Sequence, residues 1–200
     1  MKKFLKQFII FMLPVIILAI VLEVSVRRIP NDYEYKKEYL EKHSNSVETL
    51  ILGNSHAYYG IAPKYFTSNT FNAAYVSQPL EFDLEILERY QHEMPNLKTV
   101  IVPVSYSSLF EKLEEGTEAW RIKNYVIYYN FNKAAALSHH FEIFTNKLKI
   151  TLSKFVKYYI DHKSELSCAK DGWGIYENSG TPEEVIATGK EAALRHTVKD

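Results

Sequence analysis

Residues 50–57 (LILGNSHA) carry the residue types best suited to chemistry in this 200-residue chain. Three apolar residues lead into Gly53 and Asn54, a pattern that predicts a buried strand ending in a turn. Ser55 would then lie just past the carboxyl end of the strand, where α/β folds place their ligands. Its hydroxyl group could act as a nucleophile, with its own backbone N–H facing an oxyanion. A plain strand-to-loop turn with a capping serine explains the same spacing equally well.

The histidines near this segment and beyond it are poorly placed as bases. His56 directly follows Ser55, and because neighbouring side chains diverge, we expect His56 to line a pocket or to cap the following helix. His139 and His140 have no carboxylates in register with them, so no metal site is expected. Cys168 is the only cysteine, which excludes an intrachain disulfide, and nothing indicates a cofactor.

The hydrophobic pattern predicts an open α/β sheet. Strands are expected at about residues 48–53, 70–76 and 99–104, the last a continuous apolar run typical of a strand buried on both faces. A helix over residues 80–94, with Leu80, Leu84, Leu87 and Met94 along one face, separates the second and third strands. This alternation is typical of parallel sheets with right-handed crossovers.

The second half of the chain is predicted to be mainly helical. Apolar residues between positions 148 and 160 form one amphipathic stripe. A second helix should begin at Thr181 and Pro182, which fit the N-cap and first-turn positions, and end near His196.

Residues 7–26 have the length and composition of a membrane anchor. Positions 8–22 contain no charge, and a helix to Val26 would span roughly 28 Å, close to the hydrocarbon thickness of a bilayer. Glu23 would lie near the far interface, where its carboxylate reaches water. A buried helix of a soluble protein or a cleaved signal peptide would share these features, but the run lacks the small-residue pair of a cleavage site.

The anchor divides the chain into four parts: a basic N-terminus (1–6), the membrane helix (7–26), a polar linker (27–46), expected to be a helix or an extended stalk, and one α/β domain (47–200). Three lysines precede the helix and two arginines follow it. A short basic N-terminus before a first helix favours a cytoplasmic N-terminus and an extracytoplasmic domain. Lys plus Arg equals Asp plus Glu, at 24 each, so no overall positive field would attract nucleic acid.

Residues 53–56 (GNSH) resemble the first sequence block of the SGNH, or GDSL-like, hydrolases. Residues 71–78 and 102–106 are similar to the second and third blocks, and residues 171–174 and 191–196 also resemble segments of membrane-anchored members. The resemblance covers most of residues 48–200. It implies a flavodoxin-like, three-layer α/β fold.

The resemblance also implies roles for individual residues. Ser55 takes the place of the nucleophile, with Asn54 and His56 beside it in the pocket. The second-block glycine, an oxyanion donor in the family, is replaced here, and Ser77 or Gln78 stands nearest. Ser105 stands at the position of the third-block asparagine, which is a side-chain oxyanion donor in the family.

The family's late Asp-x-x-His is absent, because none of the seven histidines has an aspartate three residues before it. Three strands are also few for a parallel sheet, and the chain ends soon after a well-capped helix. We therefore expect an incomplete copy of a longer protein. The expected function is that of an envelope esterase or O-acyltransferase acting on acetyl groups of a surface glycan. The alternative is a non-catalytic, membrane-anchored protein that binds a polysaccharide or assists its assembly.

Overall fold

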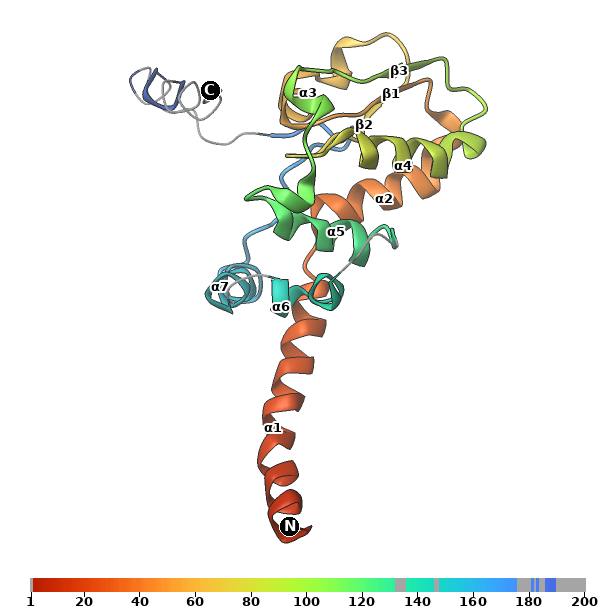
Figure 1. The fold of residues 1–200 in the computed structure, drawn as a ribbon. Helices are drawn as coiled ribbons and strands as arrows, with labels where there is room; N and C mark the ends of the chain where they lie inside the picture. The colour runs from red at the N-terminus through yellow and green to blue at the C-terminus, as the bar shows by residue number, and fades with distance from the viewer. Residues whose placement is uncertain are drawn as a thin grey trace.

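A three-stranded parallel sheet forms the centre of the computed structural model, which describes residues 2–131, 136–145, 148–175, 181, 183 and 186–189. Its strands are β1 (Thr49–Ile51), β2 (Thr70–Asn72) and β3 (Thr99–Ile101), in the order β2-β1-β3 (Figure 1). Leu50 lies opposite Phe71 on one side and Val100 on the other. The predicted strands and the α/β class are confirmed, with shorter strand bounds.

The two faces of the sheet are covered by different helices. Leu50 and Leu52 pack with α2 (Asp32–His43) and α4 (Leu80–Tyr90), and α5 (Ile122–Ile127) completes this larger core. Ile51 faces the other way and packs with Ala57 of α3 (Ser55–Gly60) in a smaller cluster. In Figure 1, α2 and α4 lie together below the sheet.

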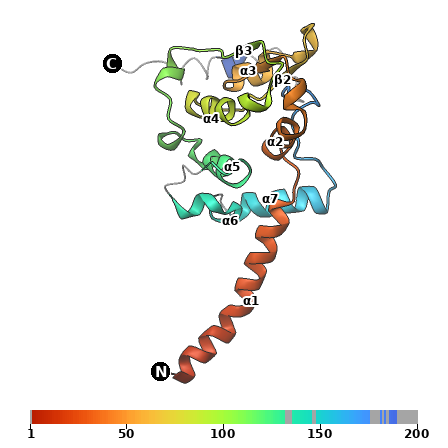
Figure 2. The same ribbon diagram turned by 90° about the vertical axis from the view of Figure 1, so that its right-hand side faces the viewer.

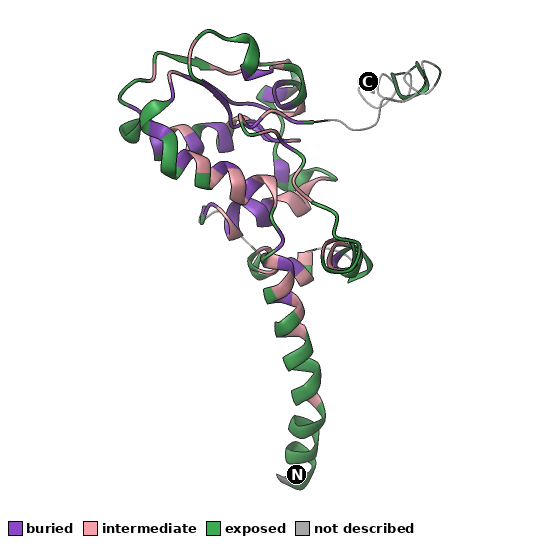
Figure 3. Cartoon of the chain, turned by 180° about the vertical axis from the view of Figure 1, so that it is seen from behind, coloured by how far each residue is buried: buried purple, intermediate pink, exposed green. Residues whose placement is uncertain are grey.

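The N-terminal helix α1 (Lys2–Arg27) projects away from the domain (Figures 1 and 3). It is long and apolar enough to cross a membrane, and its apolar side chains are exposed along most of its length. Pro14 lies inside the helix without ending it. The exposure of α1 argues against the alternative of a core helix in a soluble protein.

The segment predicted as a linker, residues 27–46, instead supplies a core helix. Tyr33, Lys36 and Leu40 of α2 are buried, with Tyr33 and Leu40 in the larger core. Asn31 caps the helix by accepting hydrogen bonds from the N–H groups of Tyr33 and Glu34. The helix agrees with the predicted helix or extended stalk, but its burial was not predicted, because tyrosine and the stem of a lysine bury apolar surface in a segment that reads as polar.

The expectation that the third strand is buried on both faces was also wrong. Thr99 and Val100 are exposed and Ile101 is half-buried. Because β3 is an edge strand of the described sheet, it has a neighbour on one side only.

Helix α4 begins at the predicted residue but ends at Tyr90, and its buried face only partly matches the predicted stripe, of which Leu87 and Met94 pack in or against the core. Phe82, Ile86 and Tyr90 lie in the core, whereas Leu84 is 54% exposed. The two aromatic side chains lie in the core beneath the sheet, where Phe82 stacks against the ring of Tyr125. The helix therefore turns its larger side chains inward and leaves a leucine in solvent.

Two further helices cross the base of the domain beside α1: α6 (Glu142–Thr145) and α7 (Leu148–Tyr159) (Figure 2). Of the helix predicted over 182–196, residues 183 and 186–189 are helical, and the rest lies outside the described residues. Short 3₁₀ turns occupy Ser44–Ser46, Pro63–Tyr65, Gln91–Glu93, Ser107–Leu109, Leu113–Glu115, Ala119–Arg121 and Leu137–His140.

Residues 168–174 fold back against β2 and α3. The backbone N–H of Asn72 donates to the carbonyl oxygen of Asp171 at 2.9 Å, and that of Gly174 donates to Tyr58 at 2.9 Å. Gly172 has φ of +82°, and a Cβ there would lie 2.0 Å from the carbonyl oxygen of Asn72. Only glycine fits this close approach.

Candidate functional site

The turn after the central strand is held by a buried carboxylate. Gly53 has φ of +113°, a left-handed conformation that favours glycine. Its N–H donates to Oδ1 of Asp83 at 2.7 Å, and its carbonyl oxygen accepts from the N–H of Tyr75 at 3.1 Å. These bonds tie the end of β1 both to α4 and to the segment after β2.

Asn54 caps the short helix that begins with Ser55. The Oδ1 atom of Asn54 accepts from the N–H of His56 at 3.1 Å, and its backbone oxygen accepts from Ala57 and Tyr58. Asn54, not His56, is therefore the capping residue. The turn leaves Ser55 half-buried and His56 exposed.

Four of the predicted site residues line one cavity of about 520 Å³: Asn54, Ser55, His56 and Ser77. Apart from Val76 and Pro79, its other lining comes from the segment between β3 and α5, which contributes polar and charged residues: Glu111, Lys112, Thr117, Glu118 and Arg121. No local motif in the sequence distinguished that segment, because its residues reach the cavity through the fold and not through spacing. Glu118 and Arg121 form an ion pair beside the cavity.

Ser77 has an unusual backbone conformation within this group. Its φ is +58°, a left-handed value at a residue that carries a Cβ. Such a conformation costs on the order of 1 kcal/mol, and surrounding structure must hold it. The next residue, Gln78, is buried, and both the nitrogen and the oxygen of its side-chain amide are hydrogen-bonded, which fixes the backbone beside Ser77.

Gln78 supports the turn and does not line the cavity. Its Nε2 donates to Oδ1 of Asp83 at 2.5 Å, and its Oε1 accepts from the hydroxyl group of Tyr125 at 2.9 Å. Because Asp83 also accepts from Gly53, these side chains join α4, α5 and the turn in one buried network.

Ser105, the remaining predicted site residue, lies outside the lining of the cavity. Its hydroxyl oxygen lies 2.8 Å from that of Ser108, and its N–H donates to the same Ser108 oxygen at 3.2 Å. The structure thus places Ser105 in a local turn after β3, outside the group of residues that lines the cavity.

Asp83 is the residue of this region that sequence reasoning missed. Burial raises its pKa to about 6, while the hydrogen bonds from Gly53 and Gln78 lower it. The available signal was an acidic residue beside Phe82 on what proved to be the core face of α4. The stripe predicted from the sequence passed through Leu84 and therefore did not include Asp83.

The hydroxyl group of Ser55 makes no hydrogen bond to any residue that the structure describes. Potential bases nearby are Glu111 and Glu118, which line the same cavity as His56. No group of three or more His, Cys, Asp or Glu side chains suited to a metal ion occurs in the described part of the chain. The site thus offers an accessible hydroxyl group, backbone N–H groups and carboxylates.

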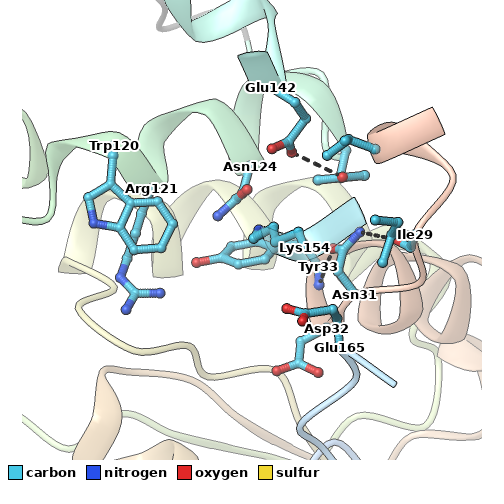
Figure 4. Close-up of a pocket in the computed structure, with 12 residues that line it drawn as sticks. Ile29, Asn31, Asp32, Tyr33, Trp120, Arg121, Asn124, Glu142, Lys154 and Glu165 are labelled. Carbon is cyan, nitrogen blue, oxygen red and sulfur yellow. Dashed lines mark hydrogen bonds between the residues drawn. The ribbon is translucent and has the colours of Figure 1, made fainter. Parts of the chain in front are cut away.

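A second, smaller cavity of about 160 Å³ lies where α1, α2, α5, α6 and α7 meet. Figure 4 shows its polar lining, with Tyr33, Asn124, Glu142 and Lys154 among the residues around it. Lys123 and Glu142 form a buried ion pair at its edge, with Nζ and Oε1 2.7 Å apart. This cavity belongs to the junction between the apolar helix and the domain.

Comparisons with models of protein families, with curated proteins and with solved structures find no match to this chain. The fold and the sequence therefore define its class by themselves. It is an α/β protein with a three-stranded parallel sheet and one N-terminal helix able to cross a membrane.

Proposed function

We propose that this chain is a membrane-anchored, SGNH-like protein that removes or transfers acyl groups, acetyl foremost, on a glycan of the cell envelope. The observation that carries the proposal is the position of Ser55. It follows the central strand at its carboxyl end and lines the 520 Å³ cavity together with Ser77.

The strand order supports a flavodoxin-like fold of the SGNH type. From β1 the chain passes to β2 on one side and then crosses to β3 on the other. The order β2-β1-β3 agrees with the first three strands of the flavodoxin-like order. In such sheets ligands bind at the carboxyl ends of the strands where the order reverses, and Ser55 lies at that end of β1.

In the proposed reaction, the Ser55 oxygen loses its proton to a base and attacks the ester carbonyl. The bond to the glycan oxygen breaks, and the glycan leaves as its hydroxyl form with that proton. Water or a second hydroxyl group then attacks the acyl-serine, releases acetate or the new ester, and restores the Ser55 hydroxyl group. Backbone N–H groups of Ser55 and Ser77 hold the oxyanion. The left-handed backbone of Ser77 supports this role, since it is a conformation that the family's glycine would adopt without strain. The base that receives the serine proton is proposed to be Glu111 or Glu118, whose residues line the same cavity.

Acetate release tests this proposal. The full chain in detergent is incubated with an O-acetylated polysaccharide or with p-nitrophenyl acetate, and wild type is compared with Ser55→Ala. We expect the substitution to abolish turnover without altering the melting temperature. Ser153→Ala, at an exposed position on α7, is the matched control and should retain full activity. Turnover by Ser55→Ala equal to wild type would reject Ser55 as the nucleophile.

A second candidate function is non-catalytic binding of a polysaccharide. It is favoured by one observation: no described histidine contacts the Ser55 hydroxyl group. Under this alternative, wild type and Ser55→Ala bind the glycan equally and neither releases acetate.

The helix α1 is proposed to span the membrane with its N-terminus in the cytoplasm. The basic residues Lys2, Lys3 and Lys6 support this orientation. Reporter fusions after Asp200 test it: a reporter active only outside the cytoplasm should give signal, and one active only inside should not. The opposite pair of results would reverse the topology.

A further inference from the structure

Helix α7 exposes an apolar stripe that no described residue of the domain covers. Two of its residues, Leu152 and Val156, are 45% and 41% exposed. Ile160, the residue just after the helix, is 63% exposed. These residues follow one another at intervals of four, so they share one face. Together with Leu148, they form what we call the α7 stripe.

The other sides of α7 have assigned neighbours. Thr151 is buried, and Lys154 lines the small cavity beneath the domain. At about 100° per residue, Val156 lies about 160° around the helix from Lys154. The α7 stripe therefore points away from the domain.

The direction in which the stripe points is the direction in which α1 leaves the domain. The hydroxyl group of Tyr159 donates to the carbonyl oxygen of Ser25, near the end of α1, at 3.0 Å. Figures 1 and 2 show α7 lying across α1 at the base of the domain, with the rest of α1 extending beyond it. The exposed apolar surface of α1 extends up to Val24, one residue before this contact.

The charges on α7 suit the boundary between lipid and water. Lys149 and Lys157 are exposed beside the stripe; Lys157 pairs with Glu165, with Nζ and Oε1 3.2 Å apart, and the ammonium group of Lys149 can reach lipid phosphates. Phe144 of the neighbouring α6 is also exposed. A helix with an apolar face, flanking lysines and aromatic residues is the type that lies in the plane of a bilayer surface.

We propose that α7 is a second membrane contact, lying flat in the bilayer interface with the α7 stripe among the upper acyl chains. The occupant of the stripe is a phospholipid bilayer, because the apolar surface of α1 ends at the same level. The inference rests on the proposed membrane span of α1. Two crossed helices would hold the domain upright and keep the Ser55 cavity at a constant height above the membrane.

Spin-label accessibility in vesicles of phosphatidylcholine and phosphatidylglycerol tests the inference on the full chain. A nitroxide is attached at Val156→Cys in the stripe, at Lys157→Cys as the matched control about 100° around the helix, and at Leu18→Cys in α1. Cys168 is buried, so unsubstituted chain treated in the same way gives the labelling blank. Collisions with oxygen report lipid, and collisions with a water-soluble nickel chelate report solvent.

We expect the label at position 156 to collide with oxygen and not with nickel, and the label at position 157 to collide with nickel. Strong nickel collisions at 156 would overturn the inference. Few collisions of either kind at 156 would also overturn it, because they would indicate a protein partner. The label at position 18 separates the two proposals: oxygen collisions there, with nickel collisions at 156, reject the second contact alone. Nickel collisions at 18 would reject the span and the inference together.

Discussion

The carboxylate of Glu23 in α1 accepts hydrogen bonds from the backbone N–H of Glu142, at 3.1 Å, and from that of Ile143, at 3.0 Å. The apolar helix therefore caps the N-terminus of α6, and Arg27 pairs with the same carboxylate. The sequence predicts that the Glu23 carboxylate reaches water at the membrane interface. This prediction is wrong, because the side chain is buried where α1 meets α6. Helix N-terminal amides and an arginine replace the water that a buried carboxylate would otherwise need.

Glu23→Ala should loosen the junction, because it leaves two backbone amides of α6 without an acceptor. Loss of such a cap typically costs about 1 kcal/mol or more. Hydrogen exchange in detergent micelles should show faster exchange at residues 142–145, with α4 unchanged. Glu23→Gln, which keeps one acceptor oxygen, is the matched control and should have a smaller effect. Unaltered exchange in the alanine variant would contradict the capping role.

Asp83 should make stability depend on pH in the acidic range. Its pKa is raised from 3.8 to about 6 by burial, so between these values the folded chain holds a proton that the unfolded chain has released. The free energy of unfolding should therefore fall as the pH rises from about 4 to about 6, by roughly 3 kcal/mol from this group.

Urea unfolding of wild type and Asp83→Asn at several pH values isolates this contribution. The asparagine oxygen can still accept from Gly53, but the side chain does not titrate. We expect the difference in unfolding free energy between the two proteins to shift in favour of the variant as the pH rises. A difference that stays constant from pH 4 to pH 7 would show that Asp83 has an ordinary pKa.

Gly172→Ala should destabilise the contact between the segment 168–174 and β2. The added Cβ would meet the carbonyl oxygen of Asn72, at a backbone conformation unfavourable for alanine. The expected cost is about 2 kcal/mol or more, visible as a lower melting temperature. Gly60→Ala is the control: a Cβ there meets nothing within 4 Å, so that variant should melt at or slightly above the wild-type temperature. Equal melting of both variants would contradict this account of Gly172.

The sequence was sufficient for the elements whose signals are local. The apolar run before Gly53 and Asn54 identified β1, its turn and the start of α3, and the long apolar run identified α1. The position of α4 was also predictable. These features depend on periodicity and turn chemistry within a few residues.

The features that were missed depend on contacts between distant segments. Asp83 lies beneath Gly53, 30 residues away in the sequence, and Glu23 caps α6 more than a hundred residues later. Residues of 111–121 reach the cavity only because the chain after β3 returns over the sheet's carboxyl edge. No window of sequence contains these pairs, and in α4 the choice between the Leu84 face and the Phe82 face was decided by the space under the sheet.

Covalent labelling tests the central claim, that Ser55 is an activated nucleophile, most directly. The full chain in detergent is treated with a fluorophosphonate, which bonds to activated serines, and the modified peptide is identified by mass spectrometry. We predict one adduct, on Ser55, that is absent from Ser55→Ala and unchanged in the Ser153→Ala control. A folded wild-type chain that remains unlabelled, or one labelled equally at Ser77 or Ser105 in the Ser55→Ala variant, would contradict the claim.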